Sequence, residues 1–320
     1  MSMFIGLDFG GTNLKGALGT STGEIITKLS KPSLADQSQK TIFNNMFLAV
    51  EELLEQAMRR SENVSAIGIG SPGSIDFKTG KLVGSTTNIK HWRDVPIKKN
   101  FEDRFNLSTW VDNDANLMAL AEARKGAGQN YSNILCATLG TGIGGGIILN
   151  NLLHRGVNYS AAEIGHIIIE YNGRLCNCGN RGCLEAYAAA PGMVDRYRKK
   201  LKRTGVLYNV DELSAEFIFH KAELNEDLAK ETIIETCEYL GVGFASIVNI
   251  IDPEIIIVGG GVAEAGEEFI KLIEKYVKKF VINSIAKKLK VVKAQLTMDA
   301  GITGAILLAS ENYLSQHEGN

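Results

Sequence analysis

A strand, a glycine-rich turn and a second strand occur together twice in this chain, about half its length apart. In the first half, the apolar runs 3–9 and 13–19 flank one such turn. In the second half, the runs 133–139 and 147–150 flank another. Because each half contains the same hairpin pattern, the sequence predicts a weak internal duplication of fold.

Between and after these hairpins, strand-like runs alternate with helical periodicity. The clearest helical stripe lies within residues 40–60 and consists of Ile42, Met46, Val50, Leu53, Leu54 and Ala57. The other expected strands cover 24–29, 64–70, 110–112, 255–258 and 289–292. The other expected helices cover 116–125, 210–219, 227–250, 267–282 and 303–314. Strands that alternate with helices predict an α/β architecture.

Length and charge restrict the class of protein. The chain has 320 residues, 45% of them hydrophobic, which is enough for two packed domains. With 34 basic and 36 acidic side chains, it lacks the positive charge typical of nucleic-acid binding proteins. We find no apolar run that we expect to span a bilayer and no signal-peptide pattern over residues 1–15. We therefore expect a cytoplasmic protein with neither a nucleic-acid nor a membrane partner.

The first glycine turn follows Asp8 and is suited to binding phosphate. Gly10 and Gly11 leave no side chain between the backbone and a ligand, so that several N–H groups can converge on one anion. Thr12 adds a hydroxyl donor, and Asp8 suits a hydrated Mg²⁺ that bridges phosphate oxygens. The alternative is an ordinary glycine hairpin with a solvated aspartate.

The second glycine turn, residues 140–146, favours the phosphate interpretation. No Gly-Lys-Ser/Thr follows it and a strand rather than a helix comes next, so it is neither a Walker loop nor a dinucleotide fingerprint. Two such hairpins, one from each half, would hold a triphosphate between them across a cleft. A third cluster, Gly259-Gly260-Gly261, ends the strand 255–258, where ligands of open α/β sheets collect. That cluster alone is equally typical of a plain strand-to-helix turn.

Asp114 lies between the end of a strand and the start of a helix. One interpretation makes it the N-cap of that helix. The other makes it a general base, because a helix N-terminus favours an ionised carboxylate, which can accept the proton of an attacking hydroxyl. Phosphoryl transfer depends mainly on positioning and charge neutralisation, so a modest base is sufficient.

The most specific local signal consists of His166, Cys176, Cys178 and Cys183. Four nitrogen and sulfur ligands in this spacing match a closed tetrahedral zinc site, which we expect to be structural. A set of free buried thiols is the alternative. Zinc on one nitrogen of His166 would aim the other at a ligand. Glu163 and Glu185 belong to the same segment and are candidates to accept hydrogen bonds from a polyol.

Taken together, these motifs resemble the ROK family (repressors, open reading frames and sugar kinases) over nearly the whole chain. The ordered set is specific even though each motif alone is not. It comprises Asp8-Phe9-Gly10-Gly11-Thr12-Asn13, Ser71-Pro72-Gly73, Asn113-Asp114-Ala115-Asn116, the stretch 139–146, Glu163-Ile164-Gly165-His166, the stretch 176–185 and Gly259-Gly260-Gly261-Val262.

The resemblance implies an actin-like ATPase (ribonuclease H-like) fold with two lobes and an interlobe cleft that binds ATP and sugar. The small lobe would cover 1–115, with a C-terminal helix at 300–320 packing back on it, and the large lobe 116–299. Asp114 would be the catalytic base. The nucleotide would be bound by Asp8, Gly10, Gly11, Thr12, Asn13, Lys15, Thr141, Gly142, Gly259, Gly260 and Gly261. The sugar would be bound by Gly73, Thr86, Asn88, Asn113, Asp114, Glu163, His166 and Glu185.

The same resemblance implies an ATP-dependent kinase that phosphorylates the 6-hydroxyl of a hexose, with Mg²⁺ and a structural Zn²⁺, and forms a homodimer or homotetramer. Glucose is the expected acceptor. Ala161-Ala162 stands where many family glucokinases carry a glycine before the glutamate, and N-acetylmannosamine, N-acetylglucosamine and fructose are alternative acceptors. Thr138 replaces the aspartate of some actin-like ATPases, which favours transfer to sugar over hydrolysis. A sugar-responsive repressor is disfavoured. We expect such a repressor to carry a helix-turn-helix ahead of the first strand, and the first expected strand here begins at Met3.

Overall fold

The computed structural model describes residues 2–84, 86, 89–286 and 288–317, which form two compact units. Unit 1 consists of Met1–Gln129, Leu153–Ala161 and Leu296–Asn320. Unit 2 consists of Asn130–Leu152 and Ala162–Gln295. The chain therefore passes between the units four times, and the C-terminal segment belongs to the unit that contains the N-terminal strand.

Unit 1 is built on a mixed sheet in the order β3-β2-β1-β4-β7. β1 and β2 form the antiparallel hairpin around the first glycine turn, while β4 and β7 run parallel to β1. The bounds of these strands are β1 Ser2–Phe9, β2 Asn13–Thr20, β3 Ile25–Pro32, β4 Asn63–Ser71 and β7 Ser108–Asn113. A short separate hairpin consists of β5 Ser74–Asp76 and β6 Lys81–Val83.

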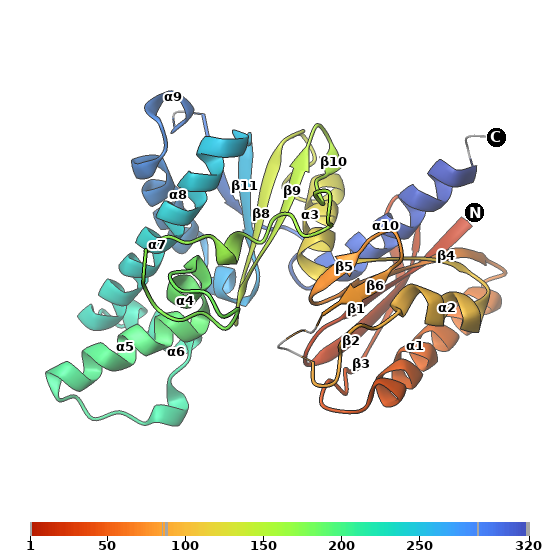
Figure 1. Cartoon of the computed structure of the whole chain (residues 1–320), viewed down its shortest axis with the longest axis horizontal. Coiled ribbons are helices and arrows are strands. Elements are labelled where there is room, and N and C mark those ends of the chain that lie inside the picture. Colours follow the sequence, from red (N-terminus) through yellow and green to blue (C-terminus); the bar gives the residue numbers. More distant parts are fainter. Residues whose placement is uncertain (1, 85, 87–88, 287, 318–320) are drawn as a thin grey trace. The chain divides into compact units, whose positions relative to one another are not determined.

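Helices cover both faces of this sheet because the strands alternate apolar side chains between the faces. In β1, Phe4 packs with residues of α3 and α10, whereas Ile5 and Leu7 pack with residues of α1 and α2. Figure 1 shows α10 and α3 on one side of the sheet and α1 and α2 on the other. The bounds are α1 Gln39–Arg59, α2 Ile97–Phe105, α3 Asp114–Lys125 and α10 Ala300–His317, which follows the short 3₁₀ turn Thr297–Asp299.

α10 approaches the sheet closely because glycines leave room for its backbone. A Cβ atom on Gly68 would lie 1.9 Å from the carbonyl oxygen of Ala305, and one on Gly6 would lie 2.5 Å from that of Ile302. On the other side of α10, a Cβ on Gly304 would lie 2.1 Å from the Leu117 oxygen in α3. At these glycines the backbones of the helix and the sheet are therefore in direct contact, while side chains such as Phe4 and Ile306 fill the rest of the interface.

Unit 2 repeats the strand topology of unit 1, as the sequence predicts. Its sheet has the order β10-β9-β8-β11-β12, in which β8 and β9 are antiparallel and β11 and β12 run parallel to β8. The bounds are β8 Ile134–Leu139, β9 Ile143–Leu149, β10 Leu152–Leu153, β11 Ile255–Gly259 and β12 Lys290–Lys293. In each unit, a hairpin pairs through its first strand with a parallel strand that arrives much later in the chain.

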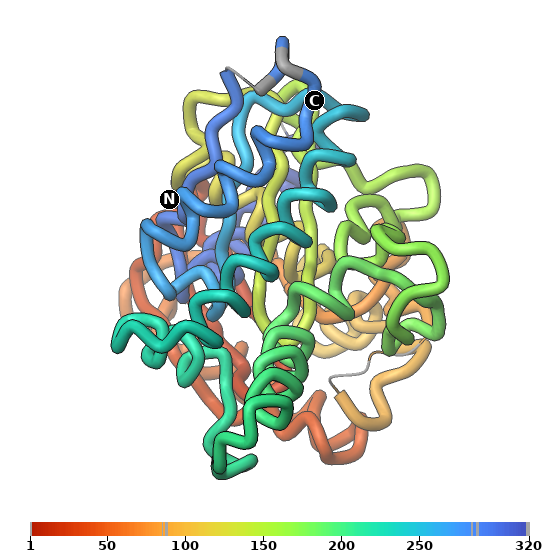
Figure 2. Tube along the Cα trace, turned by 90° about the vertical axis from the view of Figure 1, so that its left-hand side faces the viewer, coloured from red at the N-terminus to blue at the C-terminus, as the bar shows by residue number. Residues whose placement is uncertain are grey.

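The helices of unit 2 pack on its sheet around one hydrophobic core. Figure 2 views α5–α8 in green to blue with the strands of the same unit behind them. The bounds are α4 Leu184–Ala188, α5 Ala190–Thr204, α6 Ala215–Glu223, α7 Asp227–Ile251, α8 Glu267–Phe280 and α9 Asn283–Ala286. Short 3₁₀ turns occupy Ile164–His166, Val210–Glu212 and Gly261–Ala265.

α7 corrects the expectation that no apolar stretch is long enough to cross a membrane. By length and composition it is long and apolar enough to do so. Half of its most apolar window is buried in unit 2, where Leu240, Phe244 and Val248 belong to the core. A core helix satisfies the same criterion, so this is weak evidence for a membrane span.

Several boundaries differ from the sequence expectation. The expected helix 210–219 is a 3₁₀ turn followed by α6, and α2, α4 and α5 were not predicted. Unit 1 extends beyond the expected boundary at residue 115 to Gln129, because α3 packs against α10. It also takes in Leu153–Ala161, where Arg155 forms an ion pair with Asp112.

We predict that Gly68→Ala destabilises unit 1. The new methyl group would overlap the α10 backbone, and overpacking of this kind costs about 1–3 kcal/mol or more. The measurement is the midpoint of urea unfolding. Gly261→Ala is the control, because a Cβ there meets nothing within 4 Å. Equal midpoints for the two variants would contradict the backbone contact between α10 and β4.

Candidate functional site

The carboxyl ends of the parallel strands in unit 1 bring several predicted residues to one edge of the sheet. Asp8 pairs in register with Gly70, and Gly70 pairs with Asp112 on β7. Neighbouring strands lie about 4.8 Å apart, so Asp8 and Asp112 are separated by two such spacings. Asn113 and Asp114 follow Asp112 directly, and they therefore lie at the same edge as the first glycine turn.

Asp8 is a partly buried carboxylate enclosed by the start of α10. A Cβ atom on Gly301 would lie 2.3 Å from its Oδ2 atom, so a side chain there would displace the carboxylate. The pKa of Asp8 is raised to about 6, mainly by burial and then by the negative charge of Asp114, while Lys15 opposes the shift. Lys15 is itself held by the Met298 carbonyl oxygen, which accepts a hydrogen bond from its Nζ at 2.8 Å. A divalent cation beside Asp8 would favour its ionised form, so the residue fits the predicted Mg²⁺ site.

The first glycine turn is held by backbone hydrogen bonds while its tip stays exposed. Gly10 N–H donates to the Asn13 oxygen at 3.0 Å. Ser33, directly after β3, braces the turn, since its Oγ donates to the Gly11 oxygen at 2.7 Å and its N–H donates to the Thr12 oxygen at 3.0 Å. Gly11, Thr12 and Asn13 are exposed. The turn is therefore a preformed loop whose outer atoms are available to a ligand.

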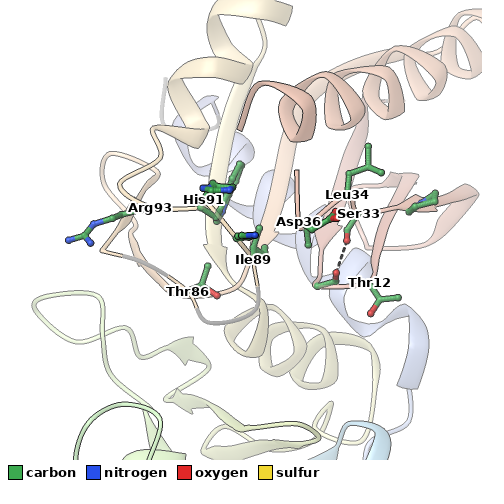
Figure 3. Close-up of a pocket in the computed structure, with 13 residues that line it drawn as sticks. Thr12, Ser33, Leu34, Asp36, Thr86, Ile89, His91 and Arg93 are labelled. Carbon is green, nitrogen blue, oxygen red and sulfur yellow. Dashed lines mark hydrogen bonds between the residues drawn. The ribbon is translucent and has the colours of Figure 1, made fainter. Parts of the chain in front are cut away.

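A pocket of about 910 Å³ in unit 1 begins at this turn. Figure 3 shows Thr12 and Ser33 on one wall and Thr86 and Ile89 on the other, with the Arg93 side chain pointing away. The pocket thus joins Thr12, predicted to bind nucleotide, to Thr86, predicted to bind sugar. Asn88, also predicted to bind sugar, lies outside the described residues.

The structure separates the roles of Asn113 and Asp114. Asn113 is the N-cap of α3, and its Oδ1 accepts hydrogen bonds from Ala115 N at 2.9 Å and Asn116 N at 3.4 Å. Asp114 is the first residue of the helix and its Oδ1 accepts from Ala115 N at 3.0 Å. The interpretation of Asp114 as the N-cap is therefore wrong, because Asn113 occupies that position.

Asp114 as a residue is exposed to solvent, while neighbouring protein atoms crowd its carboxylate and partly desolvate it. Burial raises its pKa, while hydrogen bonds from Ala115 and from Asn113 oppose the shift. A raised pKa makes the carboxylate a stronger proton acceptor than an ordinary aspartate. The hydrogen bond from Ala115 N–H fixes Oδ1 against the α3 backbone.

Gly73 joins this group through Asn113. The Asn113 Nδ2 atom donates to the Gly73 oxygen at 3.1 Å, so both ends of the Asn113 amide are fixed. Gly73 has a φ of +96°, and a Cβ there would lie 2.7 Å from a Leu82 methyl group. The predicted sugar ligands Gly73 and Asn113 are therefore in direct contact.

Sequence reasoning missed the buried ion pair beneath these residues. The side chain of Asp112 is 3% exposed, and its Oδ2 lies 2.7 Å from Arg155 Nε. Its Oδ1 accepts from Asn113 N at 2.8 Å and from Asn116 Nδ2 at 2.9 Å. The Arg155 guanidinium also stacks on Phe77 at 3.7 Å. No local pattern identifies this pair, because Arg155 lies 43 residues farther along the chain.

In unit 2, the second glycine turn lies beside the third glycine cluster. Gly259 pairs in register with Thr138 at the end of β8. Gly260 has a φ of +86°, and a Cβ there would lie 2.4 Å from the Leu139 oxygen. Thr141 at the tip of the turn is exposed. The third glycine cluster therefore lies against the strand end from which the second glycine turn starts.

Glu185 is attached to the second glycine turn. Its Oε2 accepts a hydrogen bond from Ile143 N at 2.9 Å, and a Cβ on Gly142 would lie 2.6 Å from that oxygen. Its Oε1 lies 3.8 Å from the Cys176 sulfur. Glu185, predicted to bind sugar, therefore connects the turn to the cysteine cluster.

The four predicted metal ligands converge. The ligand atoms of His166, Cys176, Cys178 and Cys183 all lie within 4.8 Å of one another. Cys178 and Cys183 have their sulfurs 3.7 Å apart, and Cys176 Sγ lies 3.8 Å from His166 Nδ1. A tetrahedral zinc site with Zn–S bonds of about 2.3 Å places its sulfurs roughly 3.8 Å apart. The donor set and its spacing therefore fit zinc.

Two glycines shape the loop that holds these ligands. Gly179 and Gly182 have φ values of +93° and +81°, a conformation that favours glycine. Cys176 N–H donates to the Asn180 oxygen at 2.8 Å and closes the loop. With Nδ1 of His166 facing Cys176, its Nε2 lies 4.0 Å from Glu163. The second imidazole nitrogen thus faces a predicted sugar ligand.

Comparison with known proteins agrees with this arrangement. A glucokinase of Halalkalibacterium halodurans is 36% identical over 99% of this chain and 98% of its own length. A putative xylose repressor of a Caldicellulosiruptor species is 30% identical over 98% of this chain and 80% of its own. A solved structure, a ROK family glucokinase from Streptomyces griseus in complex with glucose and AMPPNP, is 33% identical, with a TM-score of 0.82 over 97% of this chain and all of the other.

The similarity confirms the expected actin-like ATPase fold, which is that of the ROK sugar kinases. The model of the ROK family matches residues 4–312 of this chain. The predicted motifs lie within this range, from Asp8 to Val262. This chain belongs to the ROK family.

Proposed function

We propose that this protein transfers the terminal phosphoryl group of ATP to the 6-hydroxyl of a hexose, and that glucose is its acceptor. The observation that carries the proposal is the Asp114 carboxylate at the start of α3. The residue is accessible to solvent, its Oδ1 is fixed by Ala115 N–H, and crowding by neighbouring protein atoms raises the pKa of the carboxyl group. The names of the relatives support the sugar kinase assignment, since one is a glucokinase and another was solved with glucose and AMPPNP.

In the proposed reaction, Asp114 acts as the general base. Its Oδ2 accepts the proton of the sugar hydroxyl while the sugar oxygen attacks the terminal phosphorus. A bond forms between that oxygen and phosphorus, the bond from phosphorus to the bridging oxygen breaks, and ADP leaves with the bonding electrons. Asn113 holds Asp114 in place by capping the same helix, so the base does not need to reorient.

The glycine turns supply the phosphate contacts in this proposal. Gly10, Gly11, Thr12 and Asn13 in unit 1, and Thr141 and Gly142 in unit 2, present exposed or partly exposed backbone at the ends of strands. Asp8 would hold Mg²⁺, which neutralises charge on the phosphates. Lys15 and the segment 259–261 complete the proposed nucleotide site.

The proposed sugar ligands are those that the family resemblance implies, namely Gly73, Thr86, Asn88, Asn113, Glu163, His166 and Glu185. Carboxylates and imidazole accept hydrogen bonds from sugar hydroxyls in patterns that differ between acceptors. N-acetylmannosamine, N-acetylglucosamine and fructose are the alternatives. A coupled kinase assay over these four sugars tests the choice, and a kcat/KM highest for an acceptor other than glucose would refute it.

A second candidate is a sugar-responsive repressor, because xylose repressors are among the relatives. Such a protein would bind a sugar without phosphorylating it and would bind DNA in a salt-dependent way. ADP release that depends on sugar distinguishes the kinase from this alternative.

We further propose that the kinase is cytoplasmic, forms a homodimer or homotetramer and contains one structural zinc ion.

Asp114→Asn is expected to lower kcat by roughly two to four orders of magnitude while glucose affinity is retained, because only the proton acceptor is lost. The kcat comes from the coupled assay and the affinity from calorimetry. Asp103→Asn on α2, an exposed aspartate, is the matched control and should leave both unchanged. A kcat within a few-fold of the parent would leave Asp114 without a catalytic role.

Ionisation of Asp8 should lower the free energy of unfolding as pH rises. Its folded pKa of about 6 exceeds the unfolded value of 3.8, so its favourable contribution is complete below pH 4 and is lost as pH rises through 6. Asp8→Asn should therefore be more stable than the parent at pH 8, and this difference should shrink below pH 4. Urea unfolding in EDTA without ligands measures it. A variant less stable than the parent at pH 8 would show that Asp8 is not desolvated.

Purified protein should contain close to one zinc ion per chain, and Cys178→Ser should lower that content sharply because one ligand is lost. Metal analysis by mass spectrometry is the measurement. Cys237→Ser provides the matched control, since Cys237 is buried in α7, away from the cluster, and its loss should leave the zinc content unchanged. Active protein without zinc would refute the structural metal.

A further inference from the structure

Arg196 on α5 is a buried cation that the proposed reaction does not use directly. Only 6% of it is exposed. Its Nη1 donates to the carbonyl oxygens of Tyr187 and, at 3.3 Å, Gly192. Its Nη2 donates to Thr236 Oγ1, and its Nε lies 3.4 Å from Glu235 Oε2, both on α7. The guanidinium thus connects α7 to the end of α4.

The element that Arg196 holds carries proposed active-site residues. α4 is five residues long, begins directly after Cys183 and includes Glu185. A helix of this length has little stability of its own and depends on its contacts. At its N-terminal end those contacts come from the cysteine cluster. At its C-terminal end the Tyr187 carbonyl faces the Arg196 cation, an arrangement that the helix dipole favours.

Aromatic side chains reinforce this connection and extend it to the cysteine loop. The Tyr187 and Tyr239 rings lie 4.7 Å apart, and the Arg196 guanidinium lies 5.2 Å from the Tyr239 ring. The Tyr187 hydroxyl accepts a hydrogen bond from Arg174 N at 2.7 Å, in the loop before Cys176. The orientation of α4 is therefore coupled to Arg196 on one side and to the cysteine loop on the other.

We propose that Arg196 is a positioning residue for sugar binding, which acts by fixing α4 and so the place of Glu185. This inference rests on the proposed function, in which Glu185 binds the sugar. Lysine cannot replace the arginine, because one ammonium group does not reach the Tyr187 carbonyl, Thr236 and Glu235 with the geometry of a planar fork. A small displacement of a binding group is sufficient to weaken a site strongly.

The test measures glucose affinity by calorimetry without ATP, together with the zinc content of each variant. Arg196→Lys should weaken glucose binding by roughly tenfold, through displacement of Glu185, while the zinc content stays at the parental level. Thr236→Val, which removes the hydrogen bond between Arg196 and Thr236, should also weaken glucose binding, but by a smaller factor. Ile273→Val on α8 is buried in the same core and serves as the control for reduced stability, with glucose affinity unchanged.

A double-mutant cycle tests whether Arg196 affects glucose binding through Glu185. Glu185→Gln should weaken glucose binding on its own, and adding Arg196→Lys should then cost little more, because both changes act on the same contact. If Glu185→Gln weakens binding but Arg196→Lys does not, the positioning role is wrong and the proposed function stands. If Glu185→Gln leaves the affinity unchanged, the proposed sugar contact fails. Fully additive losses would show that Arg196 acts by another route.

Discussion

The direct backbone contact of α10 with β1 and β4 determines much of unit 1. It requires glycine at Gly6 and Gly68, because any side chain there would collide with the helix backbone. Once α10 is seated, its first turn lies against Asp8, and the Met298 carbonyl just before it holds Lys15. The desolvation that raises the pKa of Asp8 therefore depends on a helix almost 300 residues later in the chain.

In unit 2 a carboxylate beside the glycine turn is also held by distant parts of the chain, through other contacts. Its carboxylate, Glu185, is brought to the glycine turn by a helix too short to hold itself in place. The cysteine cluster at one end of α4 and the Arg196 guanidinium at the other supply the missing contacts. A buried cation is costly unless it is paired and hydrogen-bonded, and Arg196 donates to Tyr187 on α4 and to Thr236 on α7, with Glu235 3.4 Å from its Nε.

The repeated sheet topology gives the units the same framework but different chemistry. Both place a glycine hairpin beside the carboxyl ends of parallel strands, where backbone N–H groups are available to an anion. In unit 1 the penultimate residue of the first strand is Asp8, whereas the corresponding residue of unit 2 is Thr138, whose Oγ1 accepts from Gly144 N at 3.2 Å. The acidic groups next to the turns are consequently Asp8 and Asp114 in unit 1 and Glu185 in unit 2.

Local pattern was sufficient for the α/β class, the two hairpins, the repeated topology and the four clustered metal ligands. These features depend on alternation, on glycine turns and on ligand spacings of a few residues, which a sequence displays directly. The extent of unit 1, the capping role of Asn113 and the Asp112–Arg155 pair emerged only in the structure. So did the attachment of Glu185 to Ile143 and of Arg196 to α4. Most of these contacts join residues far apart in the chain, and the cap depends on where the helix starts, so tertiary packing decided them and periodicity could not.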